Sequence, residues 1–405
     1  MSVQKLLTGS GLAQLITVGI SPVLTRIYSP TELGTLAAFL ALVGPVAILA
    51  AGGYPQAAVL PDAERRAIEL VTFTLALVAT VSIVTAILVF VSVPLLGADG
   101  ESLRWLYWLP LAVAISGANA VLVSFANRQS RYGLIASSSV VRSAAQAVGQ
   151  VGVGLVAPSA TALVGVSTLA SAVANVRLAR NYVKGVGRQR LTRRGLLEAA
   201  REYSRFPRFT LPAGLLSQAH LAGLTLAIGA IFGASTLGLW SLAQRLIATP
   251  LTLLGSAVGD VYFRRATEVR RSQGDSPLLY RRVLARLAVL SAPPFILLAL
   301  FAPWLFGVVF GPDWEQAGVY ARIMLPWLWV RFLTSPLSRT TIVFGRNRLG
   351  LLNQAALAVV ALGVALVAWQ MKWDFDLFLK ALSLLLALTY GALLFVFARI
   401  VKAAD

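Results

Sequence analysis

The chain has 405 residues, of which 58% are hydrophobic and only 13% are charged, and its mean hydropathy is +0.77. Its 35 Lys and Arg against 16 Asp and Glu give a net charge of +19, a balance that in a soluble chain points to nucleic acid. Recurring apolar runs of about 20 residues, the length that spans a bilayer core, instead predict a polytopic membrane protein with no nucleic-acid partner. The absence of Cys and the single His exclude thiolate catalysis and Cys-based metal sites, so we expect neither a metal nor a cofactor.

Twelve hydrophobic stretches follow one another along the chain and predict an all-α protein with about twelve transmembrane helices. They consume nearly the whole chain, so no soluble catalytic domain fits between them. In chain order they cover residues 7 to 25, 33 to 60, 68 to 96, 105 to 126, 133 to 156, 159 to 178, 209 to 231, 237 to 262, 284 to 309, 317 to 337, 349 to 370 and 377 to 398.

Lys and Arg are concentrated in alternate loops between these stretches. Ten lie between Arg177 and Arg208 and seven between Arg264 and Arg286, whereas the intervening loops together carry four basic residues against seven acids. Positively charged loops stay on the cytoplasmic side, which predicts that both termini are cytoplasmic. We interpret the two long basic loops as solvated topology signals that also contact anionic lipids.

The longer basic loop divides the twelve stretches six and six. Residues 27 to 34 align with residues 231 to 238, with Ile, Leu and Gly identical, and a looser match pairs residues 97 to 110 with residues 311 to 326. Six spans in each half make the two repeats parallel. We therefore expect an N-terminal six-helix bundle at residues 1–182, a basic cytoplasmic linker at 183–208 and a pseudo-symmetric C-terminal six-helix bundle at 209–405, around a central cavity.

Four arginines fall inside the hydrophobic stretches themselves: Arg142, Arg245, Arg322 and Arg331. A charged side chain at the bilayer centre costs roughly 2.5 to 3.5 kcal/mol on insertion scales, so such residues normally face a bundle interior or a water-filled cavity. An ion pair inside the bundle would be the structural explanation, but no Asp or Glu lies deep within a stretch. Because the planar guanidinium matches phosphate oxygens, these arginines favour contact with an anionic substrate.

Uncharged polar residues accompany the arginines. Arg142, Gln146 and Gln150 recur every four residues and share one helix face, and Ser167, Ser171 and Asn175 repeat that spacing in the next stretch, where helix packing explains them best. A lone His in a hydrophobic stretch is more often a packed residue than a proton relay. The remaining candidates for the polar cavity are Asn119, Gln218, His220 and Gln244.

The sequence has few motifs typical of enzymes, because it contains no phosphate-binding loop, no zinc motif and no nucleophile with a plausible base. Asp374, Phe375 and Asp376 have the acid-x-acid form that glycosyltransferases use to hold a metal and a sugar diphosphate. This motif lies in a short loop on the predicted outer side. A membrane glycosyltransferase or polysaccharide polymerase is therefore an alternative of low weight, and we assign no catalytic residues.

Several segments resemble the bacterial lipid-linked oligosaccharide flippases of the Wzx type, within the multidrug/oligosaccharidyl-lipid/polysaccharide exporter superfamily. The resemblance covers both halves of the chain. Its most characteristic part is the run LAQRLIATPL at residues 242 to 251, followed by VGDVYF at 258 to 263. The other matching segments are TRIYSPTELG at 25 to 34, GYPQAAVLP at 53 to 61, FGASTLG at 232 to 238 and FGPDW at 310 to 314.

The resemblance implies a cationic central cavity that opens alternately to each side of a bacterial inner membrane. The substrate would be an undecaprenyl-pyrophosphate-linked oligosaccharide that is moved to the periplasmic leaflet. It would serve the assembly of lipopolysaccharide O-antigen, capsule or exopolysaccharide. A polysaccharide polymerase and assembly proteins would be further partners. A cation-coupled multidrug exporter of the same superfamily is the alternative transporter, although those relatives place an acid within the first bundle and this chain does not.

Overall fold

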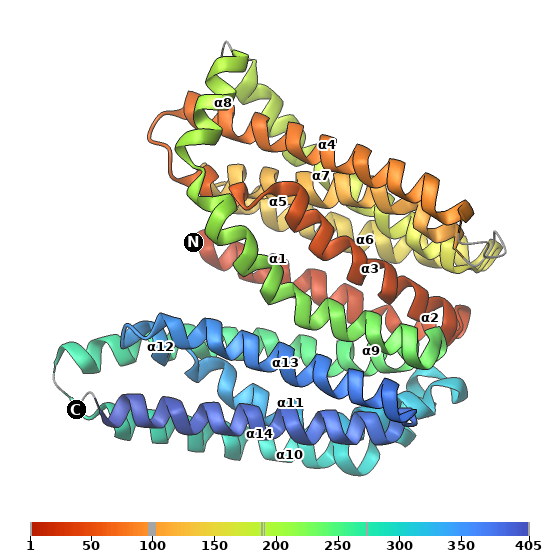
Figure 1. Ribbon diagram of the computed structural model, residues 1–405. Helices are drawn as coiled ribbons and strands as arrows, with labels where there is room; N and C mark the ends of the chain where they lie inside the picture. Colours follow the sequence, from red (N-terminus) through yellow and green to blue (C-terminus); the bar gives the residue numbers. More distant parts are fainter. Residues whose placement is uncertain (1, 96–102, 188, 190, 273, 404–405) are drawn as a thin grey trace. The chain divides into compact units, whose positions relative to one another are not determined.

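The computed structural model describes residues 2–95, 103–187, 189, 191–272 and 274–403, and every regular element in these residues is a helix (Figure 1). The chain forms two compact units, Met1–Leu226 and Ala227–Asp405. The division falls inside one long helix, whereas the sequence predicts a separate linker between the bundles at residues 183–208.

The first unit is built from long helices joined by short turns. Two of the connections contain short 3₁₀ helices, η1 (Tyr54–Val59) and η2 (Arg104–Trp108), and a short π-helical turn, η3 (Phe206–Thr210), follows α8. The helices are α1 (Ser2–Gly19), α2 (Ser21–Ile27), α3 (Pro30–Ala51), α4 (Glu64–Leu95), α5 (Leu109–Arg128), α6 (Tyr132–Val156), α7 (Ala160–Val186) and α8 (Arg193–Glu202).

Helix α9 (Leu211–Arg271) begins in the first unit and continues into the second. The second unit then contains α10 (Ser276–Phe310), η4 (Pro312–Trp314), α11 (Glu315–Leu337), α12 (Thr340–Val343), α13 (Asn347–Met371) and α14 (Phe375–Lys402).

Every predicted span overlaps a helix of the structure. Among the described residues, eight helical segments are by length and composition long and apolar enough to cross a membrane, and a shorter apolar helix covers Gly11–Ile27. One of the eight, Leu221–Arg271, has 51 residues and takes in part of one predicted span and the whole of the next. The prediction of an all-α polytopic membrane protein is confirmed.

The proposed repeat has the same chain break at equivalent positions. Ser29 separates α2 from α3 with an extended backbone (φ −70°, ψ 160°), and its side chain forms a reciprocal capping box with Glu32. The aligned residue in the second half is Gly233, where α9 leaves the helical conformation (φ 86°, ψ 166°). L-residues with a side chain rarely adopt that positive φ, so the helix can be interrupted at position 233 because the residue there is glycine. At position 29 the helix is interrupted by a capping serine instead.

Within the first unit, α1 and α6 run in the same direction and approach closely through small residues. A Cβ atom placed on Gly9 would meet Ala136, and one placed on Gly154 would meet Ile27 and Tyr28 at the other end of the helix pair. The Tyr28 hydroxyl donates a hydrogen bond of 2.7 Å to the backbone carbonyl of Gln150. Such close packing between small residues is how helices associate in membranes, where no hydrophobic force drives them together.

The basic linker is not a solvated loop throughout, which corrects that part of the sequence interpretation. Its helix α8 lies against α4, where Ala199 is buried and the Ala200 carbonyl accepts a hydrogen bond from Tyr54. Glu69 of α4 is only 3% exposed and lies beneath α8. Its carboxylate oxygens form ion pairs with the Arg65 guanidinium at 3.1 Å and the Arg66 guanidinium at 3.2 Å. Arg66 also reaches Glu202 of α8 at 2.8 Å, so ion pairs tie α8 to the first unit.

Candidate functional site

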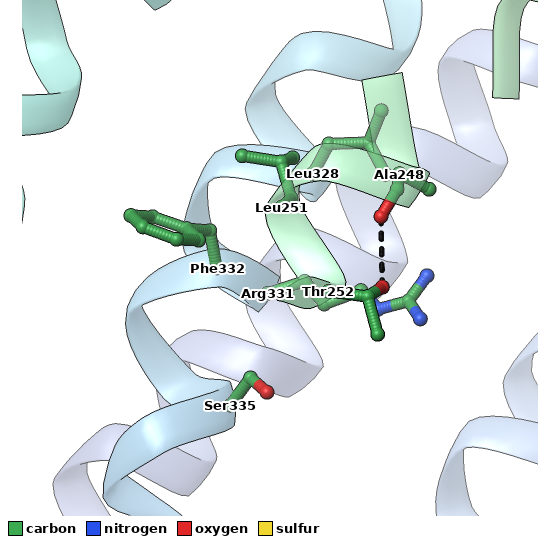
Figure 2. Close-up of a pocket in the computed structure, with 7 residues that line it drawn as sticks. All are labelled: Ala248, Leu251, Thr252, Leu328, Arg331, Phe332 and Ser335. Atoms are coloured by element: carbon green, nitrogen blue, oxygen red, sulfur yellow. Dashed lines mark hydrogen bonds between the residues drawn. The ribbon is translucent and has the colours of Figure 1, made fainter. Parts of the chain in front are cut away.

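Helices α9 and α11 enclose a small pocket of about 60 Å³ in the second unit, and Arg331 of α11 lines it (Figure 2). The guanidinium group lies beside Thr252, whose hydroxyl is already engaged as a donor to the Ala248 carbonyl at 2.7 Å. Ser335, one helical turn beyond Arg331, contributes a second hydroxyl to the lining. Among the described residues, no acid or hydrogen-bond acceptor pairs with Arg331, so the pocket presents a free guanidinium donor next to hydroxyl groups.

Arg245 lies on the face of α9 that leads into this pocket. Ala248 and Thr252, three and seven residues further along α9, both line the pocket and therefore share a face with Arg245. A Cβ atom on Gly255 would lie 3.4 Å from the Ser335 hydroxyl, which sets the parallel register of α9 and α11. In that register Arg331 is level with Leu251, about 9 Å along the axis from Arg245.

Arg245 is partly buried and, like Arg331, has no ion-pair or hydrogen-bond partner among the residues that the structure describes. Gln244 beside it is also partly buried. Arg245 and Arg331 thus form a pair of unneutralised cations along one helix interface. In an apolar setting such donors are strongly attracted to a dianionic group, because little water competes for them.

The structure separates Arg322 from Arg331, although both are on α11. Nine residues turn an α-helix by two and a half turns, which places the two side chains on opposite faces. Arg322 is exposed and does not line the pocket.

The three polar residues spaced by four on α6 have different surroundings in the structure. Gln150 is buried and its amide donates to the Ser167 hydroxyl at 3.2 Å, and Gln146 reaches the same hydroxyl at 3.5 Å. Arg142 is exposed, ten residues from the start of α6 and fourteen from its end, or about 15 and 21 Å along the axis. Gln146 and Gln150 therefore join α6 to α7, whereas Arg142 is free near the middle of its helix within the described part of the chain.

Other predicted cavity residues of the first unit also have neighbours inside it. The Asn119 amide donates to Asn175 at 2.5 Å, and Asn175 donates in turn to the Ile115 carbonyl at 2.8 Å. Gln218 of α9 lies against α3, because a Cβ atom built on Gly44 of α3 would be 3.0 Å from the Gln218 amide nitrogen. The side chain of His220 lies outside the described residues.

Three polar side chains that the sequence interpretation passed over lie buried in the helices. The side-chain oxygens of Gln14 on α1 and of Asn353 and Gln354 on α13 are buried without a hydrogen-bond partner within the described chain. From the contacts of α6 with α1 at Gly9 and with the end of α2 at Gly154, Gln14 is level with Val141, next to Arg142. All three are amide side chains within predicted spans, which is a signal that the sequence contains. They lack the four-residue spacing that identified the polar face of α6.

The acid-x-acid motif coincides with the start of a helix. Asp374 is the residue before α14 and Asp376 lies in its first turn, where a negative charge favours the helix dipole. Phe375 between them packs on Phe232 and Tyr320. The motif therefore has a structural explanation in this fold.

Comparison with known families identifies what this helical scaffold is. A family model described as "Polysaccharide biosynthesis protein" matches residues 23–318, more than half of the chain and including Arg142 and Arg245. The chain belongs to this family. No curated protein matches the chain.

Solved structures with a similar fold to this polysaccharide biosynthesis protein are membrane transporters of one superfamily. An inward-facing multidrug resistance MATE family transporter of the MOP superfamily matches with a TM-score of 0.70 at 15% identity, covering 98% of this chain and 95% of the transporter. The lipid II flippase MurJ in an inward closed conformation gives a TM-score of 0.72 at 11% identity, with 98% and 90% covered. A MOP superfamily transporter from Pyrococcus furiosus matches with 0.55 at 13% identity, with 100% and 95% covered.

These likenesses establish the fold of the polysaccharide biosynthesis protein, because identities of 11 to 15% are too low to carry a substrate across. The chain thus belongs to a polysaccharide biosynthesis family and has a fold that transporters and a flippase share. Both findings agree with the resemblance drawn from the sequence motifs.

Proposed function

We propose that this protein is a flippase that moves an undecaprenyl-pyrophosphate-linked oligosaccharide from the cytoplasmic to the periplasmic leaflet of a bacterial inner membrane by alternating access. Both termini would then be cytoplasmic. The observation that carries the proposal is the presence of free arginines within the helices: Arg245 and Arg331 in the second unit and Arg142 in the first have no acidic partner among the described residues. A family of polysaccharide biosynthesis proteins supplies the context.

The chemistry of the substrate fits these residues. A diphosphate carries two adjacent anionic groups, and each guanidinium can donate two parallel hydrogen bonds to phosphate oxygens. The Ser335 hydroxyl beside Arg331 would add a neutral donor. Gln244 is a candidate contact for the sugars, since its amide can both donate and accept.

Most of the polar candidates in the first unit have a structural role in this proposal. Asn119, Gln146 and Gln150 hold α5, α6 and α7 together through their hydrogen bonds, so we assign substrate contact there to Arg142 first. Gln218 and His220 remain weaker candidates, and Arg322, exposed on the opposite face of α11, is not assigned to the substrate.

Complementation of a flippase-deficient bacterial strain tests the proposal. The wild-type chain should restore surface polysaccharide, and Arg142→Ala and Arg245→Ala should each fail to do so while reaching the membrane in normal amounts. Full complementation by both variants would sink the assignment of these arginines to the substrate.

The fold also favours a second candidate, a cation-coupled multidrug exporter, because a MATE transporter is among the similar structures. The buried acid of the first unit, Glu69, is neutralised by Arg65 and Arg66 at one end of α4, an unsuitable arrangement for binding a cation. Deletion of the gene followed by drug-sensitivity measurements separates the two: a flippase deletion alters polysaccharide, and an exporter deletion sensitises the cell to cationic drugs.

A further inference from the structure

An apolar groove of about 580 Å³ runs between α9, α10 and α11 of the second unit. Among the described residues that line it, only Ser291 carries a polar side chain, and its hydroxyl donates to the Leu287 carbonyl at 2.7 Å and accepts from the Trp329 indole at 2.9 Å. The groove therefore offers no free hydrogen-bonding side chain. Its wall is selective for hydrocarbon.

The groove extends along the helix axes. Its lining on α9 runs from Leu246 to Val258, about 18 Å, and its lining on α10 from Leu287 to Phe310, about 34 Å, which is close to the thickness of a bilayer core. Pro250 and Pro294 belong to the lining and each removes a backbone hydrogen bond from its helix, an irregularity that favours separation of the two helix surfaces.

The groove adjoins the arginine pocket. Leu251 of α9 and Phe332 of α11 line both cavities, so one pair of side chains forms the wall between them. Figure 2 shows the Phe332 ring and the Arg331 guanidinium extending in opposite directions from α11. An anionic headgroup held by Arg331 would have hydrocarbon surface one side-chain thickness away.

We propose that this groove holds the isoprenoid chain of the diphosphate-linked substrate while Arg331 and Arg245 hold its diphosphate. The inference rests on the proposed flippase function and deepens it by giving the lipid part of the substrate a place within the C-terminal unit. The aromatic rings of Phe295, Phe306 and Phe310 would contact the branched chain.

The depth of Arg331 favours this occupant over an ordinary phospholipid. Arg331 lies sixteen residues from the start of α11 and six from its end, about 24 and 9 Å along the axis. Phospholipid headgroups stay at the membrane interface, whereas a transported headgroup must leave it. A lipid whose phosphate meets Arg331 is therefore one that the protein has withdrawn from the interface.

Binding to the purified full-length protein in nanodiscs tests the proposal, with undecaprenyl diphosphate and the short-chain geranyl diphosphate as the two probes. Leu254→Trp and Leu290→Trp fill the groove at side chains that are 58% and 76% exposed. Leu384→Trp, on α14 at 61% exposure and away from the groove, is the matched control.

We expect the two groove variants to weaken undecaprenyl diphosphate about tenfold, or about 1.4 kcal/mol, and to leave geranyl diphosphate unchanged. Arg331→Ala should weaken both probes, and the control variant neither. Binding of undecaprenyl diphosphate that needs Arg331 but is indifferent to both groove variants would overturn the groove assignment alone. Failure of both probes to bind the wild-type protein would overturn the proposed function with it.

Photo-crosslinking of the unmodified protein keeps the test decisive if a tryptophan variant fails to fold. An undecaprenyl diphosphate with a diazirine in its chain should label α9 and α10 peptides of the groove, and unlabelled undecaprenyl diphosphate should displace it. A diazirine phospholipid that labels the same peptides equally, and that undecaprenyl diphosphate cannot displace, would identify the groove as ordinary lipid-facing surface and contradict the proposal.

Discussion

Leu251 of α9 and Phe332 of α11 together separate a pocket that contains a free arginine from an apolar groove. A charged and a hydrocarbon-lined space thus share one wall within a single helical unit. This arrangement matches the two chemical parts of a lipid diphosphate. It also gives each cavity a separate mutational test.

Arg331→Ala should reduce translocation of the lipid-linked oligosaccharide, because it removes a charge-assisted donor from the pocket. A loss of about 1.5 to 3 kcal/mol corresponds to a rate roughly 10- to 100-fold lower. Arg322→Ala is the control on the same helix, since its side chain is exposed on the opposite face. Surface polysaccharide labelled in cells measures both variants, and equal loss in the two would contradict a specific role for the pocket.

Gly233→Ala should destabilise the protein by about 1 to 3 kcal/mol, because φ 86° with ψ 166° is a conformation available essentially to glycine alone. Gly363→Ala is the matched change on α13, where an added Cβ atom meets no neighbour within 4 Å. There we expect no loss and a gain of up to about 1 kcal/mol from helix propensity. Thermal unfolding in detergent measures the difference, and equal behaviour of the two variants would refute the strained turn.

Glu69→Gln should weaken the docking of α8 on α4, because the buried carboxylate positions Arg66, whose side chain reaches Glu202 and the Gly195 carbonyl of α8. We expect a loss of about 1 to 3 kcal/mol and faster tryptic cleavage at Arg201. Glu198→Gln should change little, about 0 to 1 kcal/mol, since Glu198 is half-exposed and its ion pairs are screened. Unchanged cleavage in the Glu69 variant would mean that the docking of α8 does not depend on the Glu69 carboxylate.

Tyr28→Phe should lower the free energy of unfolding by about 0.5 to 1.5 kcal/mol, through loss of the buried bond to the Gln150 carbonyl. Tyr107→Phe provides the comparison, because the Tyr107 hydroxyl has no hydrogen bond among the described residues. Thermal unfolding of the two variants should differ in that direction. A comparable loss in both would assign the effect to the ring and not to the hydrogen bond.

The all-α membrane fold could be predicted from the sequence, because long apolar runs mark the segments that form spanning helices. The structured linker could not. Helix α8 is rich in arginine and looks solvated in isolation, and only the contact of its Glu202 with the distant Arg66 of α4 shows that it is docked.

The candidate site could be predicted only in part, for a geometric reason. Residues spaced by four on a helix drift by about 40° at each step, so the stripe from Arg142 to Gln150 turns from exposed surface into the α7 interface. The spacing of nine between Arg322 and Arg331 likewise puts them on opposite faces. Residue type and depth identified the arginines, but their partners depend on which helix packs against each face.

Leaflet-resolved transport in liposomes tests the central claim most directly. Purified protein is reconstituted with a defined undecaprenyl-pyrophosphate-linked oligosaccharide, and the fraction of glycan accessible from each side is followed with time. We predict that the wild-type protein and Arg322→Ala equilibrate the lipid between leaflets, and that Arg245→Ala and Arg331→Ala do so about 10- to 100-fold more slowly. Transport by both of these variants at the wild-type rate would contradict the account.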